Sequence, residues 1–186
     1  MSNLVSYIAL FVSVFYAPAN HDKGKITTLP GVGIILNGDS ILLNRTNLLD
    51  LKKAFNISED PFLQREIWDG VDTNGNSTYG ILFRKEIKFM GITFQYESPD
   101  TVNFKLKWIR IPFNKDFEVI ILDRVRLGQI NPPIDTYFKK VTKHDYIAKD
   151  RLTYNLYSQG ISFHFEPIKK GRMLEEVSIH YRILGN

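Results

Sequence analysis

The sequence contains no cysteine, which excludes disulfide bonds, thiolate metal sites and thiol nucleophiles. It also lacks the Gly-x-Ser-x-Gly elbow of serine hydrolases, the His-Glu-x-x-His motif of zinc peptidases and the glycine-rich fingerprints of nucleotide-binding proteins. The net charge is +4, but the Lys and Arg residues are scattered and no basic run has the length of a nucleic-acid patch. We therefore expect no catalytic residue, no cofactor, no bound metal and no nucleic-acid partner.

Composition indicates a folded chain with a substantial core. Of the 186 residues, 44% are hydrophobic and 24% are charged, which are ordinary values for a globular protein. Aromatic residues make up 13%, and together with many Ile and Val residues they favour β-sheet.

Residues 1–19 allow two interpretations. Leu4 to Tyr16 is apolar and uncharged and is followed by Ala17-Pro18-Ala19, which is the outline of a cleaved secretory signal peptide. No Lys or Arg precedes the run, and the same residues are good strand formers, so we favour a buried strand and a cytoplasmic protein. Cleavage would instead indicate the periplasm. The run is too short to cross a bilayer, so we expect no membrane span.

The chain contains an internal repeat. Gly91–Glu97 (GITFQYE) reappears as Gly160–Glu166 (GISFHFE), and both copies are followed shortly by proline. The next strand-like run, Phe104–Ile111, matches Glu176–Ile183, and both end in Arg-Ile. Two matches in the same order predict a duplication, with a first repeat at residues 20–113 and a second at 114–186.

Each predicted repeat also contains a hairpin and a helix. Gly33–Leu43 reads as a hairpin because Asn37-Gly38 separates two apolar runs. Asn47–Phe55 reads as a helix capped by Asn47, and the second repeat has its equivalent helix at Pro132–Val141. The predicted fold is therefore α+β: two tandem β-β-α-β-β repeats packed as one unit, with mostly antiparallel sheets that are each covered by a short helix.

A long connection distinguishes the first repeat. Residues 56–78 include Asp72, Asn74 and Asn76, which are spaced like the start of a calcium-binding loop. The glycine and glutamate that such a loop needs further on are replaced by Ser77 and Phe83. We favour a polar hairpin turn built on Asn74-Gly75.

Two other pairs of residues are open to a chemical or a structural interpretation. His164 and His180 lie on neighbouring predicted strands, but two imidazoles without a carboxylate make a poor metal site, so we favour packing roles. Glu97 and Glu166 are equivalent carboxylates at predicted strand ends. They could act as an acid and a base, or simply end their strands at the solvent, and we favour the second interpretation.

Ile67-Trp68-Asp69-Gly70, the strand start Tyr79-Gly80-Ile81 and the paired strands that follow resemble duplicated bacterial proteins that act as immunity partners of toxins. The resemblance covers about Ile34 to Phe113 and extends to the second half by duplication. It implies a protein that binds and blocks a cognate toxin without catalysis, using the connection at residues 56–78 as its contact surface. The partner-binding residues expected on this basis are Trp68, Asp69, Asp72, Asn74 and Asn76, although Trp68 is equally compatible with a core position.

Three functional hypotheses follow. The first is a non-catalytic binding protein, most concretely an immunity protein that neutralises a bacterial toxin. The second is a small hydrolase that uses the Glu97 and Glu166 pair and has a deep pocket. The third is an exported ligand-binding or structural module, which depends on cleavage of residues 1–19.

Overall fold

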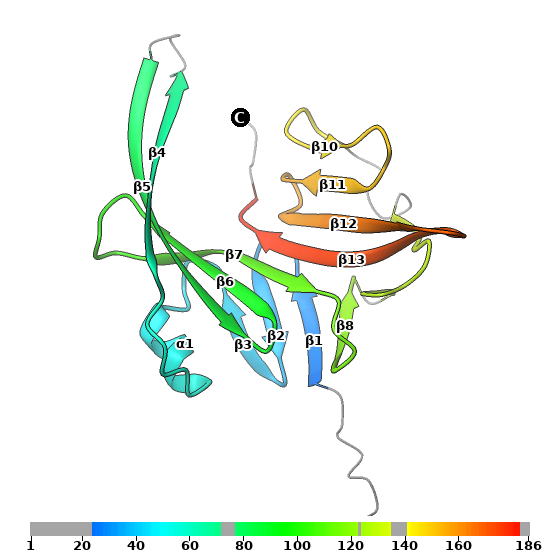
Figure 1. The fold of residues 1–186 in the computed structure, drawn as a ribbon, viewed down its shortest axis with the longest axis horizontal. Helices are drawn as coiled ribbons and strands as arrows, with labels where there is room; N and C mark the ends of the chain where they lie inside the picture. The colour runs from blue at the N-terminus through cyan, green and yellow to red at the C-terminus, as the bar shows by residue number, and fades with distance from the viewer. Residues whose placement is uncertain (1–23, 72–76, 123, 135–140, 183–186) are drawn as a thin grey trace, which may run out of the picture.

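The computed structural model describes residues 24–71, 77–122, 124–134 and 141–182. Strands make up 55% and helix 6% of the structure, so the protein is mostly β rather than α+β, and the predicted fold class is wrong. The described residues contain one helix and two large sheets, and each sheet covers the apolar face of the other (Figure 1). Sheet-on-sheet packing thus replaces the helices that were expected over each sheet.

The smaller sheet, which we name sheet A, has five strands in the order β3-β2-β1-β8-β9. The central pair β1–β8 is parallel, and the other pairs are antiparallel. The strands are β1 (Gly24–Leu29), β2 (Gly33–Leu36), β3 (Asp39–Leu42), β8 (Phe117–Ile121) and β9 (Val125–Arg126).

The larger sheet, sheet B, has eight antiparallel strands in the order β10-β11-β12-β13-β7-β6-β5-β4. It consists of two four-strand meanders that meet where β13 pairs with β7. In Figure 1, β1 and β8 of sheet A run across the direction of β13. The strands are β4 (Leu63–Val71), β5 (Ser77–Phe89), β6 (Ile92–Ser98), β7 (Lys105–Pro112), β10 (Tyr146–Ile147), β11 (Thr153–Leu156), β12 (Ile161–Ile168) and β13 (Gly171–His180).

The hairpin predicted around Asn37-Gly38 is confirmed. Leu36 pairs with Asp39, so Asn37 and Gly38 form a two-residue turn. Both have positive φ, at 51° and 98°, which is the backbone conformation that a type I′ turn requires and that Asn-Gly adopts readily.

The helix predicted at Asn47–Phe55 is present as α1 (Leu48–Ala54). Asn47 is its N-cap, because the side-chain oxygen accepts a hydrogen bond from the Asp50 amide at 2.8 Å. Leu51 is buried, and the Phe55 ring at the C-cap lies 4.8 Å from the Phe89 ring of β5. α1 therefore packs at one end of the sandwich (Figure 1). The second predicted helix, at Pro132–Val141, falls largely outside the described residues, as does the segment 1–19.

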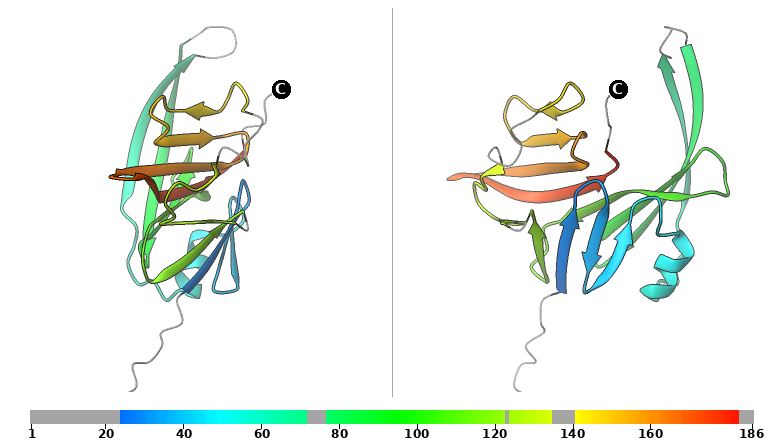
Figure 2. Two further views of the ribbon diagram at one scale, coloured as in Figure 1. Left: turned by 90° about the vertical axis from the view of Figure 1, so that its right-hand side faces the viewer. Right: turned by 180° about the vertical axis from the view of Figure 1, so that it is seen from behind.

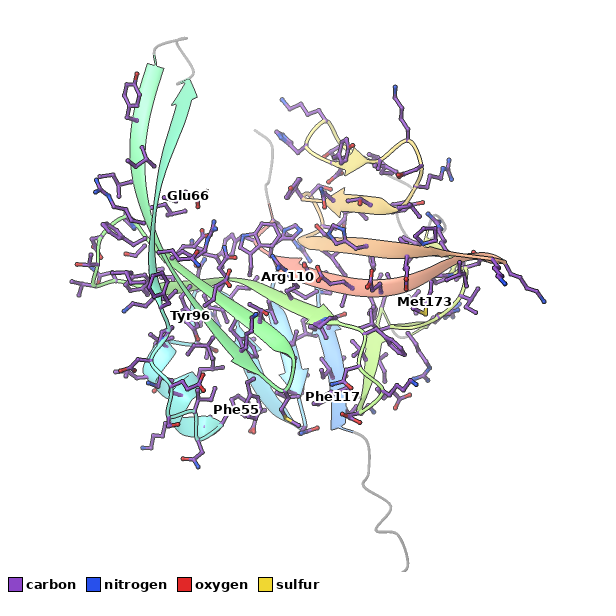
Figure 3. All side chains as sticks on the ribbon, in the orientation of Figure 1. Phe55, Glu66, Tyr96, Arg110, Phe117 and Met173 are labelled. Carbon is purple, nitrogen blue, oxygen red and sulfur yellow. The ribbon has the colours of Figure 1, made fainter. Side chains whose placement is uncertain are left out.

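Along the strands of sheet B, apolar and polar side chains alternate between the two faces, and the apolar face forms the core. Phe94 and Ile92 on β6 and their equivalents Phe163 and Ile161 on β12 point to sheet A and are fully or almost fully buried. The opposite face is largely polar, with side chains such as Gln95 and Arg110. The stick view in Figure 3 shows Arg110 near the middle of the molecule, above Phe117 of sheet A.

The repeat detected in the sequence corresponds to two similar hairpins. In β6–β7 the register shifts between Gln95 and Tyr96, and in β12–β13 it shifts between their equivalents His164 and Phe165. A bulge at the same position in both hairpins supports the equivalence of β6 and β12. The second strands of the two hairpins, β7 and β13, do not align with each other as the sequence match predicted. Trp108 pairs with Gln95, whereas Glu176 pairs with His164, so Trp108 corresponds to Glu176 and the predicted alignment was displaced by four residues.

The two predicted segments do not build separate sheets. Sheet A combines β1, β2 and β3 from the first segment with β8 and β9 from the second, and sheet B takes four strands from each. In each sheet the strands of one segment lie together and meet those of the other segment at a single pairing, β1–β8 in sheet A and β13–β7 in sheet B, as the two views in Figure 2 allow the reader to follow. Within the described residues no helix has the length and apolar character needed to cross a membrane.

Candidate functional site

Strands β4 and β5 extend beyond the rest of sheet B. β5 pairs with β6 from Phe83 to Phe89, but its residues Ser77–Leu82 pair with β4 alone. We name the two-stranded ribbon formed by Glu66–Val71 and Ser77–Leu82 the arm. Figure 1 shows it projecting away from the sandwich. The predicted long loop at residues 56–78 is thus mostly strand, and residues 72–76, which connect the paired ends of the arm, lie outside the described residues.

One face of this hairpin carries an exposed row of apolar side chains. Residues opposite each other in an antiparallel pair share a face, and so do alternate residues along each strand. Ile67 pairs with Ile81, and Leu63 and Tyr79 fall on the same face. Their exposed fractions are 42% for Leu63, 64% for Ile67, 78% for Tyr79 and 42% for Ile81. We name these four residues the apolar stripe.

The apolar stripe continues the core-facing side of sheet B. On β5, Ile87 lies on the same face as Ile81 and Tyr79, because the pairing with both neighbouring strands is regular throughout. Ile87 pairs with Phe94, and both are buried against the rest of the core. The arm therefore carries the core face of the sheet out to a region where sheet A no longer covers it. Arg65 and Lys85 lie on the same face, so the exposed apolar side chains are interspersed with cations. Exposed apolar side chains that gather on one face in this way are typical of an interaction site.

The opposite face of the same hairpin is polar and internally paired. The Arg84 guanidinium lies 3.0 Å from a Glu66 carboxylate oxygen and 3.4 Å from Glu97. Glu97 also accepts a hydrogen bond from Gln95. Figure 3 shows Glu66 at the base of the arm. Glu66 and Glu97 are thus both paired with Arg84 on this face, whereas the stripe residues lie on the other.

The structure places two of the five predicted partner-binding residues, Trp68 and Asp69, in the arm. Trp68 and Asp69 lie within β4, opposite Gly80 and Tyr79, rather than in a loop. Asp72, Asn74 and Asn76 lie outside the described residues. Sequence reasoning missed the apolar stripe itself. A two-residue turn on Asn74-Gly75, as predicted, would place Ile67 opposite Leu82, so the alignment of Ile67 with Ile81 follows only from the observed register.

The three described histidines, His144, His164 and His180, do not assemble a metal site. Within the described part of the chain no group of three or more His, Cys, Asp or Glu side chains could hold a metal ion. His164 lies opposite Glu176 and contacts Thr153, and it does not face His180. The described geometry therefore assigns no metal chemistry to either residue.

Sequence reasoning also missed a buried serine–histidine contact. Ser162 Oγ lies 2.9 Å from His180 Nε2, and both residues are only 2% exposed. The His180 Nδ1–H donates to the Tyr181 carbonyl at 3.1 Å, so Nε2 is free to accept the Ser162 hydroxyl. Burial lowers the pKa of the His180 imidazole below its ordinary value.

This pair is built for packing rather than for catalysis. The His180 ring is held between Trp108, at 4.5 Å between centroids, and Tyr157, at 5.1 Å. No carboxylate contacts the imidazole, and neither side chain is accessible to a substrate. Ser162 and His180 thus satisfy each other inside the sheet.

The two candidate catalytic carboxylates lie far apart. Glu97 lies opposite Lys105 at one end of β7, whereas Glu166 lies opposite Met173, beyond the other end of β7. At the rise of an extended strand this separates them by about 30 Å along the sheet, against the 6.5–9.5 Å or less of a carboxylate pair that hydrolyses glycosides. Glu97 and Glu166 therefore cannot act on one bond.

The described carboxylates whose pKa is shifted from the ordinary value are all shifted downward. A pocket of about 280 Å³ beside the base of β4 is lined by Asp60, whose pKa is lowered by a hydrogen bond and the charge of Lys52. The pKa of Asp100 is likewise held below its ordinary value by hydrogen bonds from Asn103, Val102 and Ser98. A general acid at pH 7 needs a raised carboxyl pKa instead.

No protein-family model, curated protein or solved structure matches the chain. The candidate site is therefore the arm with its apolar stripe, defined by geometry alone.

Proposed function

We propose that this is a non-catalytic binding protein that engages a protein partner through the arm. The observation that carries the proposal is the apolar stripe, four exposed side chains on one face of the β4–β5 hairpin, of which Ile67, Tyr79 and Ile81 lie on the projecting arm. Covering such a stripe stabilises a complex by about 25 cal/mol for each Å² of apolar surface removed from water.

The shape of the arm favours a protein over a small molecule. Small ligands bind in concave sites that bury most of their surface. The arm is a two-stranded ribbon that projects from the sandwich, and its stripe residues are up to 78% exposed. A surface of this kind is complementary to a groove or a sheet edge on another protein.

The partner class that we propose is a bacterial toxin, which makes the chain an immunity protein. The segments that carry the resemblance to immunity proteins, Ile67–Gly70 and Tyr79–Ile81, are the two sides of the arm. The resemblance and the apolar stripe thus involve the same residues. An immunity protein acts by binding its toxin and needs no catalytic carboxylate pair. The wide separation of Glu97 and Glu166 agrees with such a role.

The experiment is co-expression with the toxins encoded beside this gene, with growth as the first readout and affinity of the purified pair as the second. We expect one toxin to be neutralised, and Ile67→Ser with Tyr79→Ser to weaken the affinity at least tenfold, the size of effect typical of central interface residues. Tyr146→Ser is the matched control, because Tyr146 is an exposed tyrosine, at 57%, on β10, which lies at the opposite edge of sheet B from β4. If a partner bound the double variant as tightly as the wild type, we would conclude that the arm is not part of the interface. Failure of every neighbouring toxin to be neutralised would remove the toxin assignment.

A further inference from the structure

The outer edge of the arm offers an unpaired strand. β4 is the last strand of sheet B, and within the described residues it pairs with β5 alone over all nine of its residues. Alternate backbone N–H and C=O groups of β4 therefore point away from the sheet without a strand partner. An edge of this kind is a template for a further strand, and a two-stranded ribbon is by itself only marginally stable in water.

The side chains on the apolar face of β4 specify the character of that strand. Leu63, Arg65 and Ile67 follow one another on this face, because they alternate along β4. Arg65 is exposed and forms no ion pair with any carboxylate whose side chain is described. Glu66, the nearest carboxylate along the strand, points to the opposite face and pairs with Arg84. The face thus presents one cation between two apolar residues.

We propose that the partner adds an extended segment to the outer edge of β4, with an acidic side chain opposite Arg65 and apolar side chains opposite Leu63 and Ile67. The inference rests on the proposed function and specifies its recognition mode. It predicts the pattern apolar-x-acidic-x-apolar in the partner, since directly opposed pairs of opposite charge and of apolar side chains stabilise antiparallel strands.

Charge disfavours a second copy of this chain as the occupant. Two β4 edges paired about Arg65 would place this cation opposite itself, and like charges in that position are destabilising. The net charge of +4 adds a weak repulsion between copies.

The test uses the full-length protein and two synthetic peptides, Thr-Thr-Val-Thr-Glu-Thr-Val-Thr-Thr and the same sequence with lysine in the centre, titrated while amide NMR shifts are recorded. We expect the glutamate peptide to bind about three- to tenfold more tightly, the ratio that corresponds to a cross-strand charge pair. Arg65→Glu should reverse the preference, whereas Lys88→Glu, which changes an exposed lysine on the polar face of β5, should leave it unchanged. Two equal affinities, or no binding of either peptide at millimolar concentration, would overturn the inference.

Backbone pairing is tested by N-methylation of the glutamate peptide. One version carries methyl groups on the amides of one edge, and the other carries them on the opposite edge. Strand addition predicts that one version loses binding and the other keeps it, while binding through side chains alone would affect both equally and would overturn the proposal. A dimer in sedimentation that Arg65→Glu dissociates would assign the edge to a second copy, which also overturns it. If the protein captures a toxin through the arm but binds neither peptide, the proposed function would still hold. Only the proposed strand addition would then be overturned.

Discussion

Gly91 and Gly160 hold equivalent positions before β6 and β12, yet their surroundings differ. Both have positive φ, at 83° and 74°, a conformation that is strained for any residue with a side chain. A Cβ at Gly91 would meet no atom closer than 3.8 Å, whereas a Cβ at Gly160 would lie 2.3 Å from the Gly31 Cα. Gly31 also donates its amide to the Gly160 carbonyl at 3.0 Å, so the two backbones cannot separate without loss of this hydrogen bond.

The first prediction compares alanine at these two sites. Gly91→Ala should lower the free energy of unfolding by about 1 kcal/mol, the cost of the backbone conformation alone. Gly160→Ala should lower it by about 3 kcal/mol, because the backbone clash adds to the same strain. Urea unfolding of both variants measures the difference. Equal effects would mean that the contact between Gly31 and Gly160 is not maintained in solution.

The buried His180 gives the second prediction, which concerns pH. The imidazole is neutral in the folded protein, and its pKa there is lowered by burial, whereas the unfolded chain takes up a proton near the ordinary value of 6.5. The contribution of His180 to stability is therefore complete above pH 6.5 and is lost as the pH falls below it, by at most about 1.4 kcal/mol per pH unit. His180→Gln should reduce the slope of the unfolding free energy between pH 6.5 and 5, as measured by urea titrations. An unchanged slope would show that His180 is protonated in the fold.

At the scale of elements, the arm should be separable from the sandwich. Its stripe residues are exposed, and no strand other than β4 pairs with Ser77–Leu82. Replacing residues 67–81 by Asn-Gly would join Glu66 to Leu82, which already face each other, through a turn of the right geometry. We expect the shortened protein to unfold cooperatively with a free energy within about 1 kcal/mol of the full chain, and to lose its partner. Loss of cooperative unfolding in circular dichroism would show that the arm supports the core.

Local signals in the sequence were sufficient for some elements and not for others. Asn37-Gly38 and the Asn47 cap act through their immediate neighbours, so the hairpin and α1 could be predicted. β4 could not, because a strand in a free ribbon has no buried face and its sequence lacks the usual alternation of apolar and polar residues. The four aligned side chains of the apolar stripe become visible only once the register of β4 against β5 is known.

The order of strands in the two sheets also could not be predicted from local sequence patterns. The repeat of Gly91–Glu97 in Gly160–Glu166 correctly indicated similar strands, and it was interpreted as two tandem repeats, each with its own sheet and helix, packed as one unit. The contacts that decide the architecture are instead between segments, the parallel pair β1–β8 and the antiparallel pair β7–β13. Such long-range pairings depend on burial of the whole core and leave no short-range pattern.

At the scale of the whole molecule, the division of both sheets between the two segments predicts that neither segment folds alone. A fragment of residues 1–113 would expose the edges of β1 and β7, together with the apolar faces that the other segment's strands complete. Neither sheet would keep its full set of strands, so the entropy of ordering the chain would not be offset by burial. We expect the fragments 1–113 and 114–186 each to lack cooperative urea unfolding, and their equimolar mixture to recover it together with the dispersed amide NMR spectrum of the intact chain. Cooperative unfolding of residues 1–113 on their own would contradict this and would mean that the pairs β1–β8 and β7–β13 join two finished domains.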